Sequence, residues 1–290
     1  MSRDYDYALE RKLRELDPEL HSRFTDAVFA MLHILSNYKL IFPDFTDHTE
    51  LHSLNVIDFC NKLIASQIDK LNADEIYCIL LGCYFHDTGM GISKVDYDEF
   101  SKKIDFKDYF ETHSKDDLPA IIRSFHNEYS GLFIEKYSKF LELPSKEHLF
   151  AIKQIARGHR KTNLLDKGEY PSDFKVPNQN NICLPYLAAL VRLADEIDIT
   201  AARHVHINFD LSNVTNEIDL IEFMKHEAVK ELLVTDKEFI MKIKSDDNKV
   251  IQGLEVVAKK MQKTLDECRK AVNGVTPFEI TQERVRIVRI

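Results

Sequence analysis

The feature that most constrains the fold is the helical spacing of apolar residues through most of the chain before about residue 200. A helix predicted over residues 51–64 has one apolar face, formed by Leu54, Ile57, Cys60 and Ile64. Two more helices are predicted within residues 5–41, and the second carries a similar stripe at Phe24, Val28, Met31, Leu32 and Leu35. Glycine and proline, which interrupt helices, number only 8 each. The pattern predicts a mainly α protein built as a helical bundle.

The residue pattern changes after Ala202. The segments HVHINFD, EFIMKIKS and ERVRIVRI alternate apolar and polar residues, as half-buried strands do. Helices are predicted between them, over residues 217–233 and 249–272. A chain of 290 residues also exceeds one average domain. We therefore expect a helical domain over residues 1–202 and a small C-terminal α+β unit over residues 203–290.

Two polar segments interrupt the predicted bundle. Residues 92–116 show no clear periodicity and are predicted as an irregular insertion with one short helix, and residues 161–181 are predicted as a loop. Helical patterns lie around them, over about residues 117–140 and 146–158 and again from Pro185. Either interruption is a candidate for a lid over a site in the bundle.

Several predicted helices carry a histidine or an aspartate near one end. A capping box of Asn72 and Glu75 begins the helix that ends with His86 and Asp87. The whole set consists of His52, His86, Asp87, His126, His159 and Asp195. From one helix to the next, the separation is roughly one helix plus its connection. A bundle would therefore bring one ligand per helix to a shared centre, as a metal site requires.

The side chains in this set suit divalent transition metals. Neutral imidazoles and carboxylates favour manganese, iron, zinc, cobalt or nickel over copper–thiolate chemistry. Asp87 is the natural bridging ligand, because one carboxylate can give an oxygen to each of two ions. A bridged pair of ions lowers the pKa of a shared water, orients it for attack on phosphorus and stabilises the developing charge. We expect two divalent ions that serve phosphate ester hydrolysis.

The motifs HTELHS, GCYFHDTGMG, FHNEYSG, IARGHR and VRLADEIDIT follow one another between Phe42 and Ala202. Their order resembles the H…HD…H…H…D signature of dinuclear members of the HD-domain superfamily of metal-dependent phosphohydrolases. The resemblance implies an HD-domain helical bundle with a first metal bound by His52, His86, Asp87 and Asp195, and a second site completed by His126 and His159. FPDFTDHTELHS and the helix–strand tail are also similar to HD modules found beside histidine-kinase-like ATPases in bacteria.

Two cationic residues follow His159 directly. Arg160 can bind phosphate in a bidentate manner, and Lys161 can act as a point charge. We include both with Asp87 in the candidate catalytic set. The alternative, that they are solvated loop charges, stays open.

Four other polar residues have structural and functional interpretations that the sequence leaves open. His48 begins the same helix as the first ligand, where it would cap the helix or contact substrate. Arg192 lies one helical turn before the aspartate ligand of its helix, and we favour a structural role for it. Glu128 and Asp198 are candidates for holding a ligand in position.

Charge and composition limit the kinds of partner that we expect the protein to bind. The net charge is −9 and the basic clusters are short and scattered, so we do not expect a long nucleic acid to bind. No apolar run reaches the roughly 18 residues of a membrane span, and the start lacks a signal-peptide pattern, so we expect a cytoplasmic protein without a membrane partner. The five cysteines form no CxxC pair and are predicted to be buried, reduced thiols.

Three functions fit these features. The leading hypothesis is a phosphohydrolase that attacks a phosphomonoester or phosphodiester of a nucleotide-like small molecule through a metal-activated water. A second is a regulatory module that senses a nucleotide without turnover and signals through the C-terminal unit. A third, ranked below both, is a di-iron oxygenase, because some HD-fold proteins use a related ligand set for oxygen chemistry. The ERVRIVRI tail could pair with the sheet edge of a second copy, so a homo-oligomer is left open.

Overall fold

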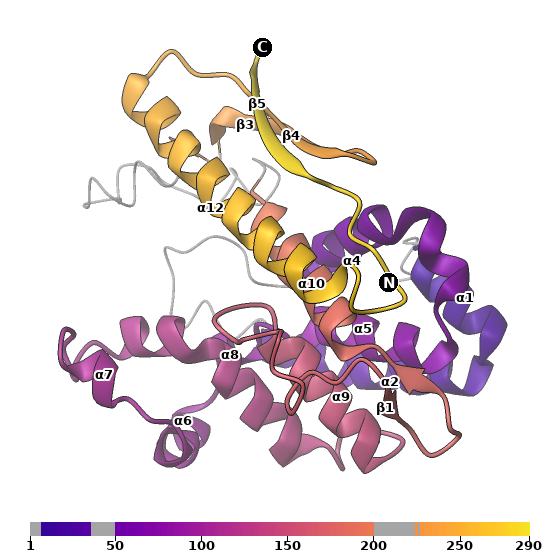
Figure 1. Cartoon of the computed structure of the whole chain (residues 1–290). Helices are drawn as coiled ribbons and strands as arrows, with labels where there is room; N and C mark the ends of the chain where they lie inside the picture. The colour runs from indigo at the N-terminus through magenta and orange to yellow at the C-terminus, as the bar shows by residue number, and fades with distance from the viewer. Residues whose placement is uncertain (1–6, 36–49, 200–223, 226) are drawn as a thin grey trace.

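A computed structural model describes residues 7–35, 50–199, 224–225 and 227–290, with residues 32–35 described by their backbone alone (Figure 1). The longer helices of the bundle are α1 Ala8–Leu16, α2 Pro18–Leu35, α4 Glu50–Ile64, α5 Ala73–Phe85, α8 Leu118–Tyr137, α9 Lys146–Arg157 and α10 Leu184–Ile197. The short 3₁₀ turns η1 Ala65–Lys70 and η2 Thr88–Gly91 follow α4 and α5. The mainly α fold class is thereby confirmed.

Helix α5 lies at the centre of the bundle. Every residue from Asp74 to Phe85 is buried, and the helix packs against α1, α2, α4, α9 and α10. The predicted capping box is present, since the Asn72 side chain accepts from the Glu75 amide at 3.0 Å and the Glu75 carboxylate accepts from the Asn72 amide at 3.2 Å. The C-terminal end of α5 thus delivers the His–Asp pair to the middle of the bundle.

The predicted apolar stripes form part of the core. Phe24, Val28 and Met31 of α2 are buried, and so are the four apolar residues of the α4 face. The side chains of Leu32 and Leu35 lie outside the described residues. All five cysteines are free and buried, as predicted. Among the described residues, no helix is both long and apolar enough to cross a membrane.

The insertion at residues 92–116 is more helical than predicted. It contains α6 Lys94–Phe100, the turn η3 Ser101–Lys103 and the short helix α7 Lys107–Phe110. Ser93 caps α6 by accepting from the Asp96 amide at 3.1 Å, and Lys94 pairs with Asp98 one turn along at 2.6 Å. These local polar contacts stabilise a helix that apolar periodicity alone did not reveal.

The second interruption, residues 161–181, contains a short hairpin. Its strands are β1 Phe174–Lys175 and β2 Asn181–Ile182, which pair antiparallel. The Asp74 carboxylate of α5 accepts from Asn178 at 2.9 Å and from Asn180 at 2.7 Å. This hairpin is therefore anchored to the central helix.

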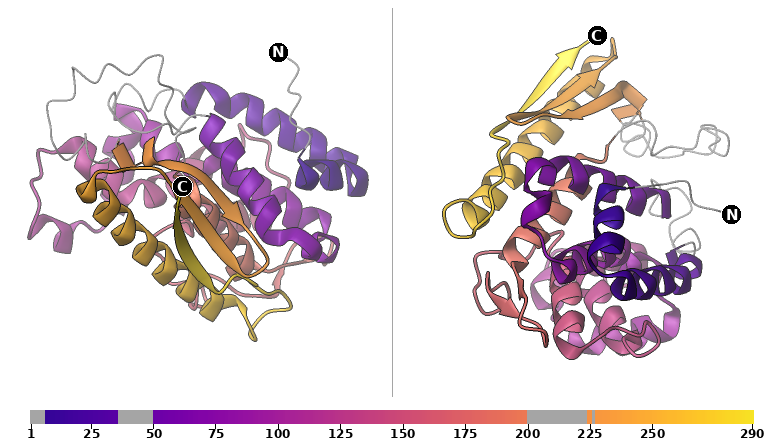
Figure 2. Two further views of the ribbon diagram at one scale, coloured as in Figure 1. Left: turned by 90° about the horizontal axis from the view of Figure 1, so that it is seen from above. Right: turned by 90° about the vertical axis from the view of Figure 1, so that its right-hand side faces the viewer.

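The C-terminal residues form a three-stranded sheet and one long helix, as the predicted α+β unit requires. Strand β4 Glu238–Ile243 pairs antiparallel with β3 Val229–Val234 and parallel with β5 Arg284–Arg289. Helix α12 Asn248–Val272 connects β4 to β5 and packs on both β5 and α10 (Figure 2). The helix predicted over residues 217–233 is wrong for its last residues, because 229–234 pair with β4. Here cross-strand packing of Val229 and Leu232 outweighs the local helical pattern.

The predicted boundary between residues 202 and 203 lies outside the described residues and stays a prediction. The HVHINFD segment lies there as well. Figure 2 shows the sheet set apart from the bundle, with α12 running beside both.

Candidate metal centre

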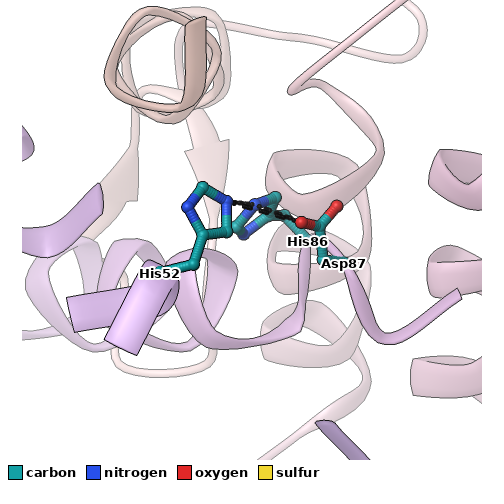
Figure 3. A group of neighbouring side chains, drawn as sticks. All are labelled: His52, His86 and Asp87. Atoms are coloured by element: carbon teal, nitrogen blue, oxygen red, sulfur yellow. Dashed lines mark hydrogen bonds and ion pairs between the residues drawn. The ribbon is translucent and has the colours of Figure 1, made fainter. Parts of the chain in front are cut away.

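Six predicted ligands come together inside the bundle. His52 lies in the first turn of α4, His86 caps the C-terminus of α5 and Asp87 follows it. The other members are His126 in α8, His159 just beyond α9, and Asp195 in the last turn of α10. Figure 3 shows the first three turned toward one another. The sequence spacing thus predicted which helices meet.

The first donor group contains His52, His86, Asp87 and Asp195. The two Nε2 atoms of His52 and His86 are 3.1 Å apart. The Oδ2 atom of Asp87 lies 3.4 Å from His52 Nε2 and 3.3 Å from His86 Nε2. The Oδ1 atom of Asp195 lies 3.3 Å from His52 Nε2 and 3.9 Å from His86 Nε2. Both carboxylates therefore lie within 3.3 to 3.9 Å of the histidine Nε2 atoms.

The second donor group uses the other oxygen of the same aspartate. Asp87 Oδ1 lies 3.2 Å from His126 Nε2 and 3.8 Å from His159 Nε2. The two Nε2 atoms are 2.8 Å apart. Each carboxylate oxygen of Asp87 thus faces its own pair of histidines, which is the arrangement of a bridging ligand.

The opposite ring nitrogen of each histidine is held by an acceptor. His52 Nδ1 lies 2.7 Å from the carboxylate of Asp198. The Nδ1 atoms of His86, His126 and His159 lie 2.6 to 2.8 Å from the carbonyls of Cys83, Arg123 and Ala156. Because these acceptors have no proton to give, Nδ1 carries it and Nε2 presents a lone pair.

This donor set fits metal ions. Two pairs of imidazole lone pairs face each other at 2.8 and 3.1 Å, which is unfavourable unless a cation lies between them. Two ligands bonded to one ion at about 2.0–2.1 Å are themselves about 3.0–3.4 Å apart at common coordination angles. Most spacings in the first group match this range.

The metal centre is buried, but it is more exposed to solvent on the side of Asp195. The histidines are nearly inaccessible, His52 being 1% exposed, whereas the Asp195 side chain is 26% exposed. Burial, together with the neighbouring imidazoles of His126 and His86, lowers the pKa of His159 well below its usual range. Its imidazole is therefore neutral at physiological pH, as metal ligation requires.

The turn after Asp87 packs tightly against α8. A Cβ atom on Gly89 would lie 2.1 Å from the carbonyl oxygen of His126, so only glycine fits. Ser130 Oγ donates to the His86 carbonyl at 2.6 Å and accepts from the Gly89 amide at 2.8 Å. These contacts fix the distance between the two donor groups. Ser130 was not among the predicted site residues, and its one signal in the sequence is its position one helical turn after His126.

Arg192 fixes the segment that follows α9. Its Nε atom donates to the Gly158 carbonyl at 2.7 Å, and its guanidinium also donates to the carbonyl and hydroxyl oxygens of Thr162 at 2.8 and 2.9 Å. These are structural contacts, of the general kind favoured from the sequence, although the partners are backbone and hydroxyl oxygens rather than an acidic side chain. The contacts of Arg192 are with the chain on both sides of His159, which the sequence did not reveal.

The remaining polar residues that the sequence singled out lie in different surroundings. Arg160 donates to the Arg123 carbonyl at 3.4 Å, and Lys161 Nζ donates to the Ser124 carbonyl at 2.8 Å, so both approach the α8 segment before His126. Glu128 forms a bidentate ion pair with Arg157 at 2.9 and 3.0 Å, and it therefore holds α8 to α9. His48 lies outside the described residues.

The sequence model of the HD-CE family matches residues 42–273. No curated protein matches the chain, and no solved structure does. The family match extends from before α4 to the end of α12, and so covers all six predicted ligands.

Proposed function

The chain belongs to the HD-CE family, and on that premise we propose that it is a metal-dependent phosphohydrolase acting on a phosphomonoester or phosphodiester of a nucleotide-like small molecule. The observation that carries the proposal is the position of Asp87, whose two oxygens face two separate histidine pairs. A shared carboxylate between two donor groups is the arrangement that two-metal hydrolysis uses.

Each donor group would hold one divalent ion. His52, His86, Asp87 and Asp195 would bind the first, and Asp87, His126 and His159 the second. Manganese, iron, zinc, cobalt and nickel all suit this set. When bound, such ions stabilise negative charge on a phosphate and lower the pKa of the water that attacks it.

The residues of the chain would position the substrate and select among phosphate esters. The buried histidines keep bulk water from the centre, and the more exposed Asp195 marks the side from which substrate would enter. Arg160 and Lys161 would bind substrate phosphate oxygens. For Lys161, this exchanges a hydrogen bond with the neutral Ser124 carbonyl for one in which both donor and acceptor are charged.

The test is hydrolysis by purified protein loaded with manganese, cobalt or nickel. The panel consists of nucleotides, cyclic nucleotides, sugar phosphates and nitrophenyl phosphates. We expect at least one to be hydrolysed, and Asp87→Ala to abolish the turnover. Absence of hydrolysis across the panel by metal-loaded protein would refute the proposal.

A second candidate is a regulatory module that binds a nucleotide without turnover, such as those found beside histidine-kinase-like ATPases. One contact favours it: Lys260 of α12 pairs at 3.0 Å with Glu196, the neighbour of Asp195. The C-terminal unit thus touches the helix that carries a candidate ligand. Nucleotide binding in calorimetry, with no product formed, would support this candidate over the enzyme.

A further inference from the structure

Aromatic side chains gather around the N-terminal half of α8, the helix that carries the candidate ligand His126. We call the cluster of Phe106, Tyr109, Phe110, His113 and Phe125 the aromatic platform. The Phe125 ring lies 4.8 Å from that of Phe106 and 5.2 Å from that of Tyr109, both nearly edge-on. The Tyr109 and His113 rings stack at 4.1 Å with an angle of 8°. The insertion therefore presents its aromatic rings around one residue of α8.

The aromatic platform is not part of the closed core. Phe106, Tyr109, Phe110 and Phe125 are half-buried and His113 is exposed, whereas Tyr77 and Phe85 in the bundle have no solvent access. Aromatic rings that keep part of their surface in water can still accept another ring by stacking.

Two chain segments connect the aromatic platform to the metal centre. Phe125 immediately precedes the ligand His126, and Lys161, two residues after the ligand His159, places its Nζ 5.6 Å from the Phe125 ring centroid. The Ser124 carbonyl that accepts from this Nζ and the ligand His126 lie in the same part of α8. The aromatic platform and the second donor group are therefore carried by the same two segments of the chain.

Cationic side chains lie between the two regions. Arg160 approaches the Arg123 carbonyl at 3.4 Å, and Arg123 is itself on the exposed side of α8. Lys161 donates to the neighbouring Ser124 carbonyl at 2.8 Å. Positive charge thus extends from the edge of the metal centre to the aromatic platform.

We propose that the aromatic platform stacks against the planar base of a nucleoside phosphate whose phosphate lies at the metal centre. Aromatic rings next to cations complement a ligand that combines a planar base with phosphate charge. The inference deepens the proposed function and rests on it, because it assigns the residues that would select a nucleotide over other phosphates.

The first test compares binding of adenosine monophosphate and ribose 5-phosphate by calorimetry on the metal-loaded full chain. Loss of base stacking costs roughly 5- to 150-fold in affinity. We expect the nucleotide to bind more tightly by a factor in this range, and Tyr109→Leu to remove most of the difference. The matched control is Phe150→Leu, which alters a half-buried aromatic pair with Phe174 near the far end of α9 and should leave the difference intact.

A second variant keeps the test decisive if Tyr109→Leu unfolds the insertion. The chain has no tryptophan, so Tyr109→Trp introduces a single fluorescent indole. We expect adenosine monophosphate to quench its emission and ribose 5-phosphate to leave it unchanged. Nucleotide binding without a change in emission, or equal affinity for the two ligands, would overturn the proposal, and so would no nucleotide binding.

The outcomes separate the two proposals. Hydrolysis of sugar phosphates with no preference for a base would leave the phosphohydrolase standing and remove the aromatic platform from its substrate site. Base-dependent binding that Tyr109→Leu weakens, without hydrolysis of any phosphate, would support the platform and reject the enzyme.

Discussion

The Nδ1 atom of His52 lies 2.7 Å from the carboxylate of Asp198, which is buried at the C-terminal end of α10. The carboxylate fixes both the orientation and the proton of this imidazole, so that Nε2 faces the other donors. Groups in this position commonly change metal affinity by about 10- to 100-fold. We predict that Asp198→Ala weakens binding of the first metal by a factor in this range.

Competition with a metal chelator measures that affinity. Asp198→Asn is the informative companion, since its amide oxygen can still accept from Nδ1 and should preserve part of the affinity. Equal chelator sensitivity in wild type and Asp198→Ala would show that the contact does not position the ligand.

The glycine after the His–Asp pair should tolerate no side chain. In Gly89→Ala the new Cβ would lie 2.1 Å from a backbone oxygen of α8, which cannot move without shifting His126. Overpacking of this kind costs about 1–3 kcal/mol or more. We predict a lower melting temperature and loss of the second metal. Gly168→Ala is the control, because its nearest neighbour is a side-chain oxygen of Asp166 at 3.2 Å, and it should melt like wild type.

Arg192→Lys should loosen the segment around His159. A lysine cannot supply the several donors that reach Gly158 and Thr162 together. Hydrogen bonds from charged groups contribute about 1.5–3 kcal/mol each, so we predict destabilisation of about 2 kcal/mol. Limited proteolysis within residues 161–173 should become faster. Unchanged proteolysis and unfolding would contradict the structural role of Arg192.

The contact between Asp74 and the hairpin predicts a specific response to acid. Burial alone would raise the pKa of Asp74, but hydrogen bonds from His148, Asn178 and Asn180 outweigh it and lower the pKa to about 2. A carboxyl whose pKa is lower in the folded state stabilises the fold above its unfolded pKa of about 4, and this contribution is lost as pH falls toward 2. The contribution of Asp74 to the free energy of unfolding is about 2 kcal/mol at neutral pH.

The measurement is the free energy of unfolding of wild type and Asp74→Asn between pH 7 and pH 2. The difference between them should be largest at neutral pH and shrink below pH 4. The exposed Asp108→Asn is the control and should show little difference at any pH. A difference for Asp74→Asn that stays constant with pH would contradict the prediction.

The helices and the meeting of the six His and Asp residues could be predicted from the sequence because each depends on local information. The α4 stripe, the capping box and the spacing of His and Asp residues depend on helical periodicity or on one helix end at a time. Strand β3 could not be predicted, because Val229 and Leu232 take their conformation from pairing with β4. The hydrogen bonds of Arg192 and Ser130 could not be predicted either, because they join segments that lie close together only in the folded bundle.

The central claim is that Asp87 bridges two metal sites, and elemental analysis after equilibrium dialysis against manganese tests it most directly. Wild type should bind two ions per chain, His126→Ala one, and Asp87→Ala none with measurable affinity. His126→Ala and Asp87→Ala should both remain folded, as circular dichroism can check. Two ions retained by folded Asp87→Ala, or fewer than two bound by wild type, would contradict the account.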